Sequence, residues 1–168
     1  WRKSVRPTRS RSSSRRCSRL GPDRRTVQLH LGGGTPTFFN ADELRQLMAM
    51  VRAHFQFTPD AELGVEIDPR TVQGGTLAML AELGFNRNSF GVQDFDPAVQ
   101  KAVHRIQPAE QVFALVESAR RLGFESINVD LIYGLPRQIP ESFDRTLAQV
   151  VQLKPDRIAL YAYAHLPE

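Results

Sequence analysis

Residues 122–136 read LGFESINVDLIYGLP, and this stretch contains the clearest sign of the fold. Its opening, Leu122-Gly123-Phe124, is typical of a helix end in which glycine takes the left-handed position and an apolar residue follows. The next run, Ile127–Tyr133, is rich in β-branched and apolar residues. The stretch therefore predicts a helix that ends directly before a buried strand.

The same junction occurs upstream, where residues 83–95 read LGFNRNSFGVQDF. Working outward, β-rich runs occupy residues 27–31, 63–67, 87–92, 127–133 and 157–163. Their spacing matches successive βα units, so we expect an α/β fold with about five parallel strands and right-handed crossovers. The pattern alone fits a doubly wound sheet as well as a partial (β/α) barrel.

Three apolar stripes with helical spacing lie between these runs. Their members are Leu44, Leu47, Met48, Val51 and Phe55; then Val112, Val116, Ala119 and Leu122; then Phe143, Leu147, Val150 and Val151. Asn40 followed three residues later by Glu43 predicts a capping box at the start of the first helix.

The formal net charge of +4 is unevenly distributed. Residues 1–25 are rich in Arg and Ser and carry ten basic residues against one acid, whereas residues 26–168 carry 12 basic and 17 acidic residues. We expect a disordered segment over 1–25 and one folded domain over 26–168. The first segment could be a transit peptide, a basic arm for nucleic acid, or non-native sequence such as a shifted reading frame, and we favour the last. Nucleic acid is therefore not the expected partner.

No apolar run approaches the roughly 18 residues of a membrane span, so we expect no membrane partner. The expected location is the cytoplasm. The glycines do not fit a dinucleotide-binding or P-loop pattern. The single cysteine, Cys17, and the lack of an H-x-x-x-H or C-x-x-C motif argue against zinc chemistry, and Ser89 lacks the context of a hydrolase nucleophile.

Polar residues gather at the carboxyl end of every predicted strand. They are Gly32-Gly33-Gly34-Thr35, then Glu66 and Asp68, then Gln93 and Asp94, then Asp130, then Tyr163 and His165. In (β/α) barrels this rim carries the active site, because the loops that follow the strands converge there. Five such strand ends favour a barrel-like site over a purely structural sheet.

Each of these residues also has a structural explanation. The glycine run either lets a ligand approach the backbone closely or simply forms a turn. Glu66 could accept hydrogen bonds from ribose hydroxyls or pair with Arg70. Asp130 lies in an apolar run, so it needs a ligand or a fixed partner.

Two further polar side chains have the same ambiguity. Gln93 could hydrogen-bond a ligand as donor and acceptor, or satisfy backbone groups of its own loop. Arg105 could recognise a carboxylate with its planar fork or remain an exposed charge at a helix end.

Five motifs in fixed order carry a resemblance to a known family. They are LGGGTPT at 31–37, VEIDPR at 65–70, FGVQDF at 90–95, NVDLIYGLP at 128–136 and YAHLP at 163–167. Together they resemble the oxygen-independent coproporphyrinogen III oxidases, a family of radical S-adenosylmethionine (SAM) enzymes, over about residues 27–168. The resemblance implies a partial (β/α) barrel of the radical SAM type whose first strand and cluster loop are missing.

The resemblance also implies the chemistry. Members of this family cleave S-adenosylmethionine at a [4Fe–4S] cluster with an electron from a reducing donor, and the resulting radical starts the oxidative decarboxylation of coproporphyrinogen III to protoporphyrinogen IX. It implies that Gly33 and Glu66 bind one S-adenosylmethionine. A second S-adenosylmethionine site would comprise Gly34, Thr35, Gln93, Arg105, Asp130 and Ala164.

One departure concerns the metal. The family holds its cluster with three cysteines, and Cys17 alone cannot replace them. We therefore assign no metal ligand and no catalytic residue, and we expect the chain as given to be an inactive fragment.

Other functions remain open. A related haem chaperone shares the glycine run and the Asp-Leu-Ile-Tyr-Gly-Leu-Pro motif, but residues 68–70, 93–95 and 163–167 favour the oxidase. A non-catalytic porphyrin- or haem-binding remnant and a nucleic-acid-binding protein are further alternatives.

Overall fold

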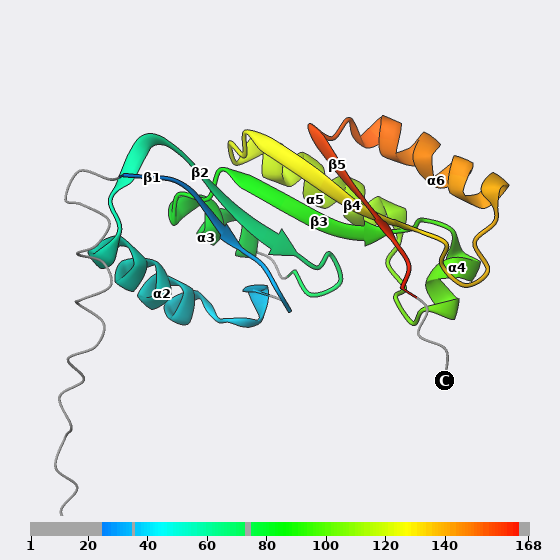
Figure 1. Ribbon diagram of the computed structural model, residues 1–168, viewed down its shortest axis with the longest axis horizontal. Coiled ribbons are helices and arrows are strands. Elements are labelled where there is room, and N and C mark those ends of the chain that lie inside the picture. Colours follow the sequence, from blue (N-terminus) through cyan, green and yellow to red (C-terminus); the bar gives the residue numbers. More distant parts are fainter. Residues whose placement is uncertain (1–24, 35, 73–74, 165–168) are drawn as a thin grey trace, which may run out of the picture.

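The computed structural model describes residues 25–34, 36–72 and 75–164. The predictions for Thr35 and His165, and for all but Arg25 of the basic segment, lie outside these residues. The described part contains one five-stranded sheet with helices between successive strands (Figure 1).

All five strands are parallel and lie side by side in the order of the sequence. They are β1 (Thr26–Leu31), β2 (Phe57–Ile67), β3 (Arg87–Gln93), β4 (Ser126–Tyr133) and β5 (Arg157–Ala162). This order confirms the predicted series of βα units. It places every carboxyl strand end at the same edge of the sheet.

The strands are connected by helices α2 (Ala41–His54), α3 (Thr76–Glu82), α4 (Pro97–Ala102), α5 (Ala109–Arg121) and α6 (Pro140–Leu153), and by the short 3-10 helix η2 (Pro36–Phe38). Asn40 accepts hydrogen bonds from the backbone of Asp42 and Glu43, and the Glu43 carboxylate accepts from Asn40 N, so the predicted capping box is confirmed. Gly84 and Gly123 both have φ of 86°, the left-handed conformation that the two Leu-Gly-Phe junctions require.

The core lies between one face of the sheet and the helices. Val65 of β2, Phe90 of β3 and Val129 of β4 are fully buried in the same cluster as Leu44 of α2 and Val112 of α5. The alternate residues of the strands face the other way and are largely polar. The sheet is thus covered by helices on one face, and the polar face is free to form the inside of a partial barrel.

Strand β2 begins six residues earlier than the predicted strand at 63–67. Thr26 of β1 pairs with Phe57, but the next pair joins Gln28 to Glu62. The pairing thus advances by two residues along β1 and by five along β2, so β2 is irregular near its start. Pro59 and Asp60 lie in this irregular part and are exposed. They interrupt the apolar alternation, so the sequence pattern did not predict the first part of β2.

The predicted apolar face of α6 is partly wrong. Val150 is buried, but Leu147 is 37% exposed and Val151 is 73% exposed. Ser142 and Thr146 face the interior instead. Their hydroxyls have fixed partners there, which makes a polar inward face stable: Thr146 Oγ1 donates to Asp94 Oδ1 at 2.7 Å.

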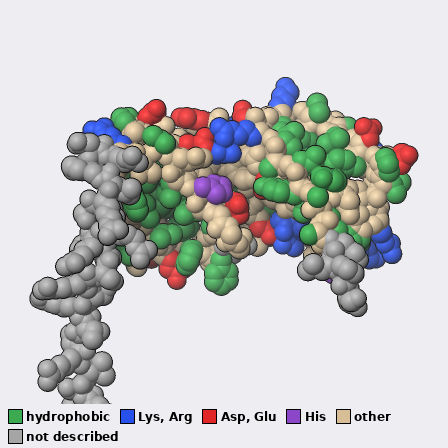
Figure 2. Space-filling model, in the orientation of Figure 1, with side chains coloured by type: hydrophobic (Ala, Val, Ile, Leu, Met, Phe, Trp, Pro, Cys, Tyr) green, Lys and Arg blue, Asp and Glu red, His purple; other side chains and the backbone are tan. Residues whose placement is uncertain are grey.

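The last members of the other two stripes, Phe55 and Leu122, are also partly exposed, because each is the residue that caps the end of its helix. At the β5 edge, Ile158, Leu160 and Tyr161 are each more than half exposed. Figure 2 shows hydrophobic side chains gathered where β5 lies in this view, and a second hydrophobic group on the side of β1. Within the described ranges, no helix is long and apolar enough to cross a bilayer.

Candidate functional site at the carboxyl strand ends

A cavity of about 150 Å³ lies at the carboxyl ends of β2, β3 and β4. We call it the strand-end cavity. Its lining consists of Gly34, Glu66, Ile67, Asp68, Ser89, Gly91, Gln93, Arg105 and Asp130. The structure thus brings together five of the eight residues singled out from the sequence, namely Gly34, Glu66, Gln93, Arg105 and Asp130.

Glu66 is held by the loop that follows β1. Gly33 N donates to Glu66 Oε2 at 3.1 Å, and His30 Nε2 lies 3.4 Å from Glu66 Oε1. The alternative pairing of Glu66 with Arg70 is wrong, because Arg70 Nη2 donates to Asp68 Oδ2 at 2.6 Å. Gly33 therefore contributes through its backbone, next to the cavity and in contact with one of its carboxylates.

Asp130 has the fixed partners that its place in an apolar run requires. Ser89 Oγ donates to Asp130 Oδ2 at 2.8 Å, and Asn128 Nδ2 donates to Asp130 Oδ1 at 2.7 Å. Asn128 Nδ2 also donates to Ser89 Oγ at 2.7 Å. Burial, together with the nearby negative charge of Glu66, raises the pKa of Asp130 above its ordinary value despite these hydrogen bonds.

Sequence reasoning missed Ser89 and Asn128 as members of the site. The signal that could have found them is the period of two along a strand, which puts Asn128 on the same face as Asp130. Ser89 is the register partner of Asn128 on the neighbouring strand β3. The three side chains therefore form one polar cluster across β3 and β4.

Gln93 occupies an irregular end of β3. The register shifts between Gly91 and Gln93, and Gln93 has φ of 68°, which is unusual for a residue with a side chain. Its Oε1 atom is buried and has no hydrogen-bond partner in the structure. The predicted alternative, in which this amide oxygen satisfies its own loop, is therefore not what the structure shows.

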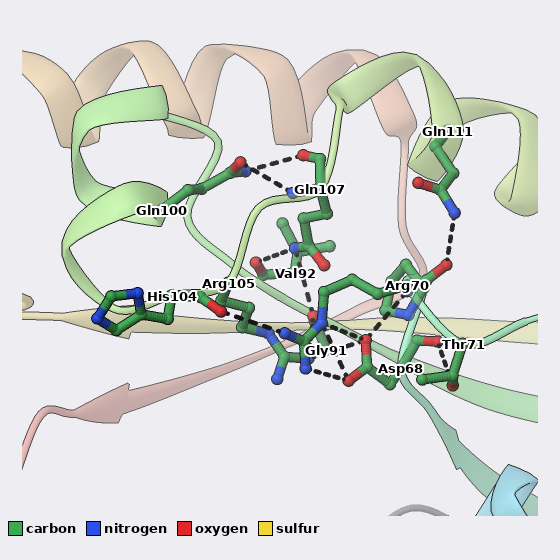
Figure 3. A network of polar contacts seen from close by, with 11 residues as sticks. Asp68, Arg70, Thr71, Gly91, Val92, Gln100, His104, Arg105, Gln107 and Gln111 are labelled. Carbon is green, nitrogen blue, oxygen red and sulfur yellow. Dashed lines mark hydrogen bonds and ion pairs between the residues drawn. The ribbon is translucent and has the colours of Figure 1, made fainter.

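Arg105 reaches the cavity from the loop after α4. Its Nη2 donates to Gly91 O at 3.0 Å and lies 3.4 Å from Asp68 Oδ1, while its buried Nε has no partner (Figure 3). Burial lowers the pKa of Arg105 from its usual high value, and the charge of Asp68 opposes this change. Arg105 therefore faces a carboxylate of the chain itself and keeps one donor free.

Asp68, which the sequence placed at a strand end but not in either predicted ligand site, also lines the cavity. Burial raises the pKa of Asp68, but hydrogen bonds from Arg70 and the charge of Arg105 outweigh this effect and hold the pKa below its ordinary value. Asp68 is thus ionised and orders both guanidinium groups beside the cavity.

Ala164 lies just after β5 and is exposed, and it does not line the strand-end cavity. Its assignment to a ligand site stays a prediction, and Thr35 lies outside the described residues.

The charges and free atoms of the strand-end cavity define the ligand that it fits. Three carboxylates, Glu66, Asp68 and Asp130, face it alongside Arg105, and this favours a ligand with a positive charge next to polar groups. Gln93 Oε1 and Arg105 Nε are buried without a hydrogen-bond partner in the structure, and both belong to residues that line the cavity. S-adenosylmethionine, with its ammonium, sulfonium, carboxylate and hydroxyl groups, fits this set. A volume of about 150 Å³ holds only part of such a molecule.

Two larger cavities lie elsewhere on the described part of the chain. One of about 720 Å³ lies between α5 and α6 on the outer surface, and one of about 490 Å³ lies between the η2 segment and α3. Neither contains the strand-end carboxylates, although Thr37, which lines the second, has a buried hydroxyl without a hydrogen-bond partner in the structure. The smaller strand-end cavity is therefore the better candidate.

A [4Fe–4S] cluster has no fitting ligand set in the described ranges. These ranges contain no cysteine, and no group of three or more potential metal ligands occurs in them.

Comparison with known proteins identifies the class. The model of the radical SAM superfamily matches residues 15–150, and the chain belongs to this superfamily. The similar curated proteins are oxygen-independent coproporphyrinogen III oxidases. The one from Pseudomonas aeruginosa is 54% identical over 143 residues, which cover 84% of this chain and 31% of that protein. The one from Helicobacter pylori strain J99 is 51% identical over 149 residues, which cover 88% of this chain and 33% of that protein.

Solved structures agree with this relationship. The coproporphyrinogen III oxidase of Escherichia coli, a radical SAM enzyme, superposes with a TM-score of 0.82 at 52% identity, over 86% of this chain and 33% of that one. The archaeal Elp3 of Methanocaldococcus infernus shares the fold alone, with a TM-score of 0.69 at 15% identity over 89% of this chain and 40% of that one. The predicted partial (β/α) barrel is confirmed. The chain spans about a third of the length of the oxidases it matches.

Proposed function

We propose that this chain is the S-adenosylmethionine-binding part of the barrel of an enzyme that oxidatively decarboxylates coproporphyrinogen III to protoporphyrinogen IX. The observation that carries the proposal is the convergence of five predicted ligand residues on one cavity, in a chain about half identical to such oxidases. Coproporphyrinogen III is the proposed substrate, a reducing electron donor the proposed partner, and the cytoplasm the proposed location.

Two S-adenosylmethionine molecules are part of the proposal. Gly33 and Glu66 would bind the first. Gly34, Thr35, Gln93, Arg105, Asp130 and Ala164 would bind the second. S-adenosylmethionine supplies the hydrogen-abstracting group when it is bound beside a reduced cluster, and the described residues would serve binding and orientation rather than electron transfer.

The side chains have distinct tasks in this proposal. The Asp130 carboxylate, fixed by Ser89 and Asn128, accepts a hydrogen bond from the ligand and compensates its positive charge. Gln93 Oε1 accepts a second hydrogen bond, and Arg105 Nε donates to a ligand oxygen. Because neither atom has a partner within the protein, hydrogen bonds from a ligand would favour the bound state.

A chimera tests the proposed function directly. Residues 26–164 replace the aligned segment of the Pseudomonas aeruginosa oxidase, and the purified protein is assayed anaerobically with coproporphyrinogen III, S-adenosylmethionine and a reductant. We expect protoporphyrinogen IX to form, and we expect Gln93→Ala in the chimera to abolish most of this activity. A matched Val151→Thr change on the exposed face of α6 should leave the activity intact.

Failure is informative if the chimera folds and carries its cluster. A chimera that binds haem but does not decarboxylate coproporphyrinogen III would favour the haem chaperone. A chimera that does neither would overturn the proposed function.

A further inference from the structure

Gln93 has an unfavourable backbone conformation that something else in the fold must stabilise. Its φ of 68° lies in the left-handed region, which is unfavourable for a residue with a side chain. Such a conformation persists when surrounding contacts over-determine it. Contacts to the residues on both sides of Gln93 could therefore hold this conformation.

Two buried glutamines bind the backbone on both sides of Gln93. Gln107 is 1% exposed, and its Nε2 donates to Val92 O and, at 3.4 Å, to Gly91 O. Gln100 is 6% exposed, and its Nε2 donates to Asp94 O at 2.9 Å. We call Gln100 and Gln107 the amide clamp (Figure 3).

The two members of the amide clamp are also bonded to each other. Gln100 Nε2 donates to Gln107 O at 2.9 Å, and Gln107 N donates to Gln100 Oε1 at 3.0 Å. The side-chain amide of Gln100 is thus coupled to the backbone of Gln107. The clamp therefore holds three carbonyl groups around an irregular strand end where the register of the β3–β4 pairing shifts.

Arg105 belongs to the same hydrogen-bond network as the clamp. Arg105 N donates to Gln100 O at 2.9 Å, and the Arg105 guanidinium shares Gly91 O with Gln107. The amide of Gln93 and this guanidinium both lie over Gly91, where a Cβ atom would be 3.1 Å and 3.0 Å from them. The amide of Gln93 and the guanidinium of Arg105 thus lie above Gly91, which has no side chain, and the clamp binds the backbone around them.

From this geometry we infer that Gln107, together with Gln100, is a positioning residue of the strand-end cavity: it holds Gln93 in its left-handed conformation and so determines ligand affinity without touching the ligand. The inference rests on the proposed function for the identity of the ligand. Gln107 itself does not line the cavity.

The test uses the 168-residue chain with the change Gln107→Met, which keeps the length of the side chain and removes its hydrogen bonds. The matched control is Asn86→Leu. Asn86 also binds backbone with its side-chain amide, donating to Ala61 O and accepting from Leu63 N, but at the opposite end of the strands. Both variants should lose stability, so stability alone does not distinguish them.

The first readout needs no ligand. In ¹H–¹⁵N spectra of the free chain, Gln107→Met should shift or broaden the side-chain amide signals of Gln93, and Asn86→Leu should leave them in place. Unchanged Gln93 signals in a folded Gln107→Met variant would overturn the inference. If that variant does not fold, Gln100→Met, which removes the donor to Asp94 O, is subjected to the same comparison.

The second readout is the affinity for S-adenosylmethionine. Gln107→Met should weaken it about tenfold, the effect of losing about one well-placed hydrogen bond, while Asn86→Leu should not. In a Gln93→Gly background, Gln107→Met should cause no further loss, because the group that it positions is absent. Additive losses would contradict the inference. If the unmodified chain binds no S-adenosylmethionine, the proposed function fails, and the amide signals alone decide the inference.

Discussion

Individual residues of the strand-end cavity differ in how they are paired. Asp130 has hydrogen-bond partners for both carboxylate oxygens, Glu66 is held by backbone and imidazole, and Gln93 and Arg105 each keep an unpaired buried atom. Carboxylates that are fixed in advance and amide or guanidinium groups that await a partner are what a preorganised binding site requires.

Gly91 leaves space for the side chains of Gln93 and Arg105. An added Cβ would lie 3.0 Å from Arg105 Nη2 and 3.1 Å from Gln93 Nε2, closer than ordinary contacts. Gly91→Ala should therefore displace both groups and weaken S-adenosylmethionine binding about tenfold, measured by calorimetric titration. The control is Gly123→Ala, far from the cavity, which should cost about 1 kcal/mol of stability through its left-handed φ and leave affinity unchanged. Equal affinities of Gly91→Ala and the parent would contradict this role of Gly91.

The raised pKa of Asp130 predicts how the free energy of unfolding changes with pH in the acid range. Because the pKa of Asp130 is raised in the folded chain, the folded chain keeps a proton that the unfolded chain has already released. The free energy of unfolding should thus fall as the pH rises from the ordinary value of 3.8 towards the higher pKa of the folded state. Asp130→Asn should remove this slope in urea denaturation series at several pH values.

Asp68→Asn is the matched control for that series. The pKa of Asp68 is lowered, so its contribution to stability is lost as the pH falls below 3.8, outside the range assigned to Asp130. The slope above 3.8 should persist in Asp68→Asn. A slope that survives in Asp130→Asn would show that another group causes it.

At the scale of elements, α6 shows how a polar residue can define a helix face. Thr146 Oγ1 donates to Asp94 Oδ1, and Gln138 Nε2 donates to Asp94 Oδ2 at 2.6 Å. Asp94 is 1% exposed and directly follows Gln93. Helix α6 and the loop before it are therefore anchored to the end of β3 through one buried carboxylate.

This anchoring predicts the effect of Thr146→Val, which keeps the shape of the side chain and removes the hydroxyl. A buried carboxylate that loses one donor should cost about 1–3 kcal/mol of unfolding free energy in urea denaturation. The control Val151→Thr, at a residue 73% exposed on the same helix, should change stability by less than about 0.5 kcal/mol. Similar losses in both variants would contradict the anchoring role.

At the scale of the whole molecule, one carboxylate joins strands from both edges of the sheet at the end opposite to the cavity. Glu62 of β2 accepts hydrogen bonds from Gln28 of β1 at 2.8 Å, from Arg87 of β3, and from Arg157 of β5 at 3.1 Å. Burial raises the pKa of Glu62, but the hydrogen bonds and charges of Arg87 and Arg157 outweigh it and lower the pKa. This network links β1 and β5 through β2 on the polar face.

Glu62→Gln should therefore destabilise the chain by about 1 kcal/mol, because two guanidinium groups lose a shared carboxylate that is only partly buried. The matched control is Asp42→Asn, whose ion pair with Arg45 is mostly exposed and should contribute less than about 0.5 kcal/mol. Thermal or urea unfolding of the two variants provides the comparison. Equal stabilities would show that the network at Glu62 is dispensable.

Much of this architecture was predictable, for identifiable reasons. The Leu-Gly-Phe junctions, the capping box at Asn40 and the regular spacing of strands are local signals, and they predicted the order of elements and the edge on which Glu66, Gln93 and Asp130 meet. What depends on long-range partners was not predictable. The inward face of α6 follows from Asp94, and the membership of Ser89 and Asn128 follows from strand register.

The most direct test of the central claim is a calorimetric titration of the unmodified 168-residue chain with S-adenosylmethionine, without iron or sulfide. If the strand-end cavity is a preorganised ligand site, the chain should show one saturable binding event, weakened at least about tenfold by Gln93→Ala and unaffected by Val151→Thr. An absence of saturable binding, or binding that is indifferent to Gln93, would contradict the account.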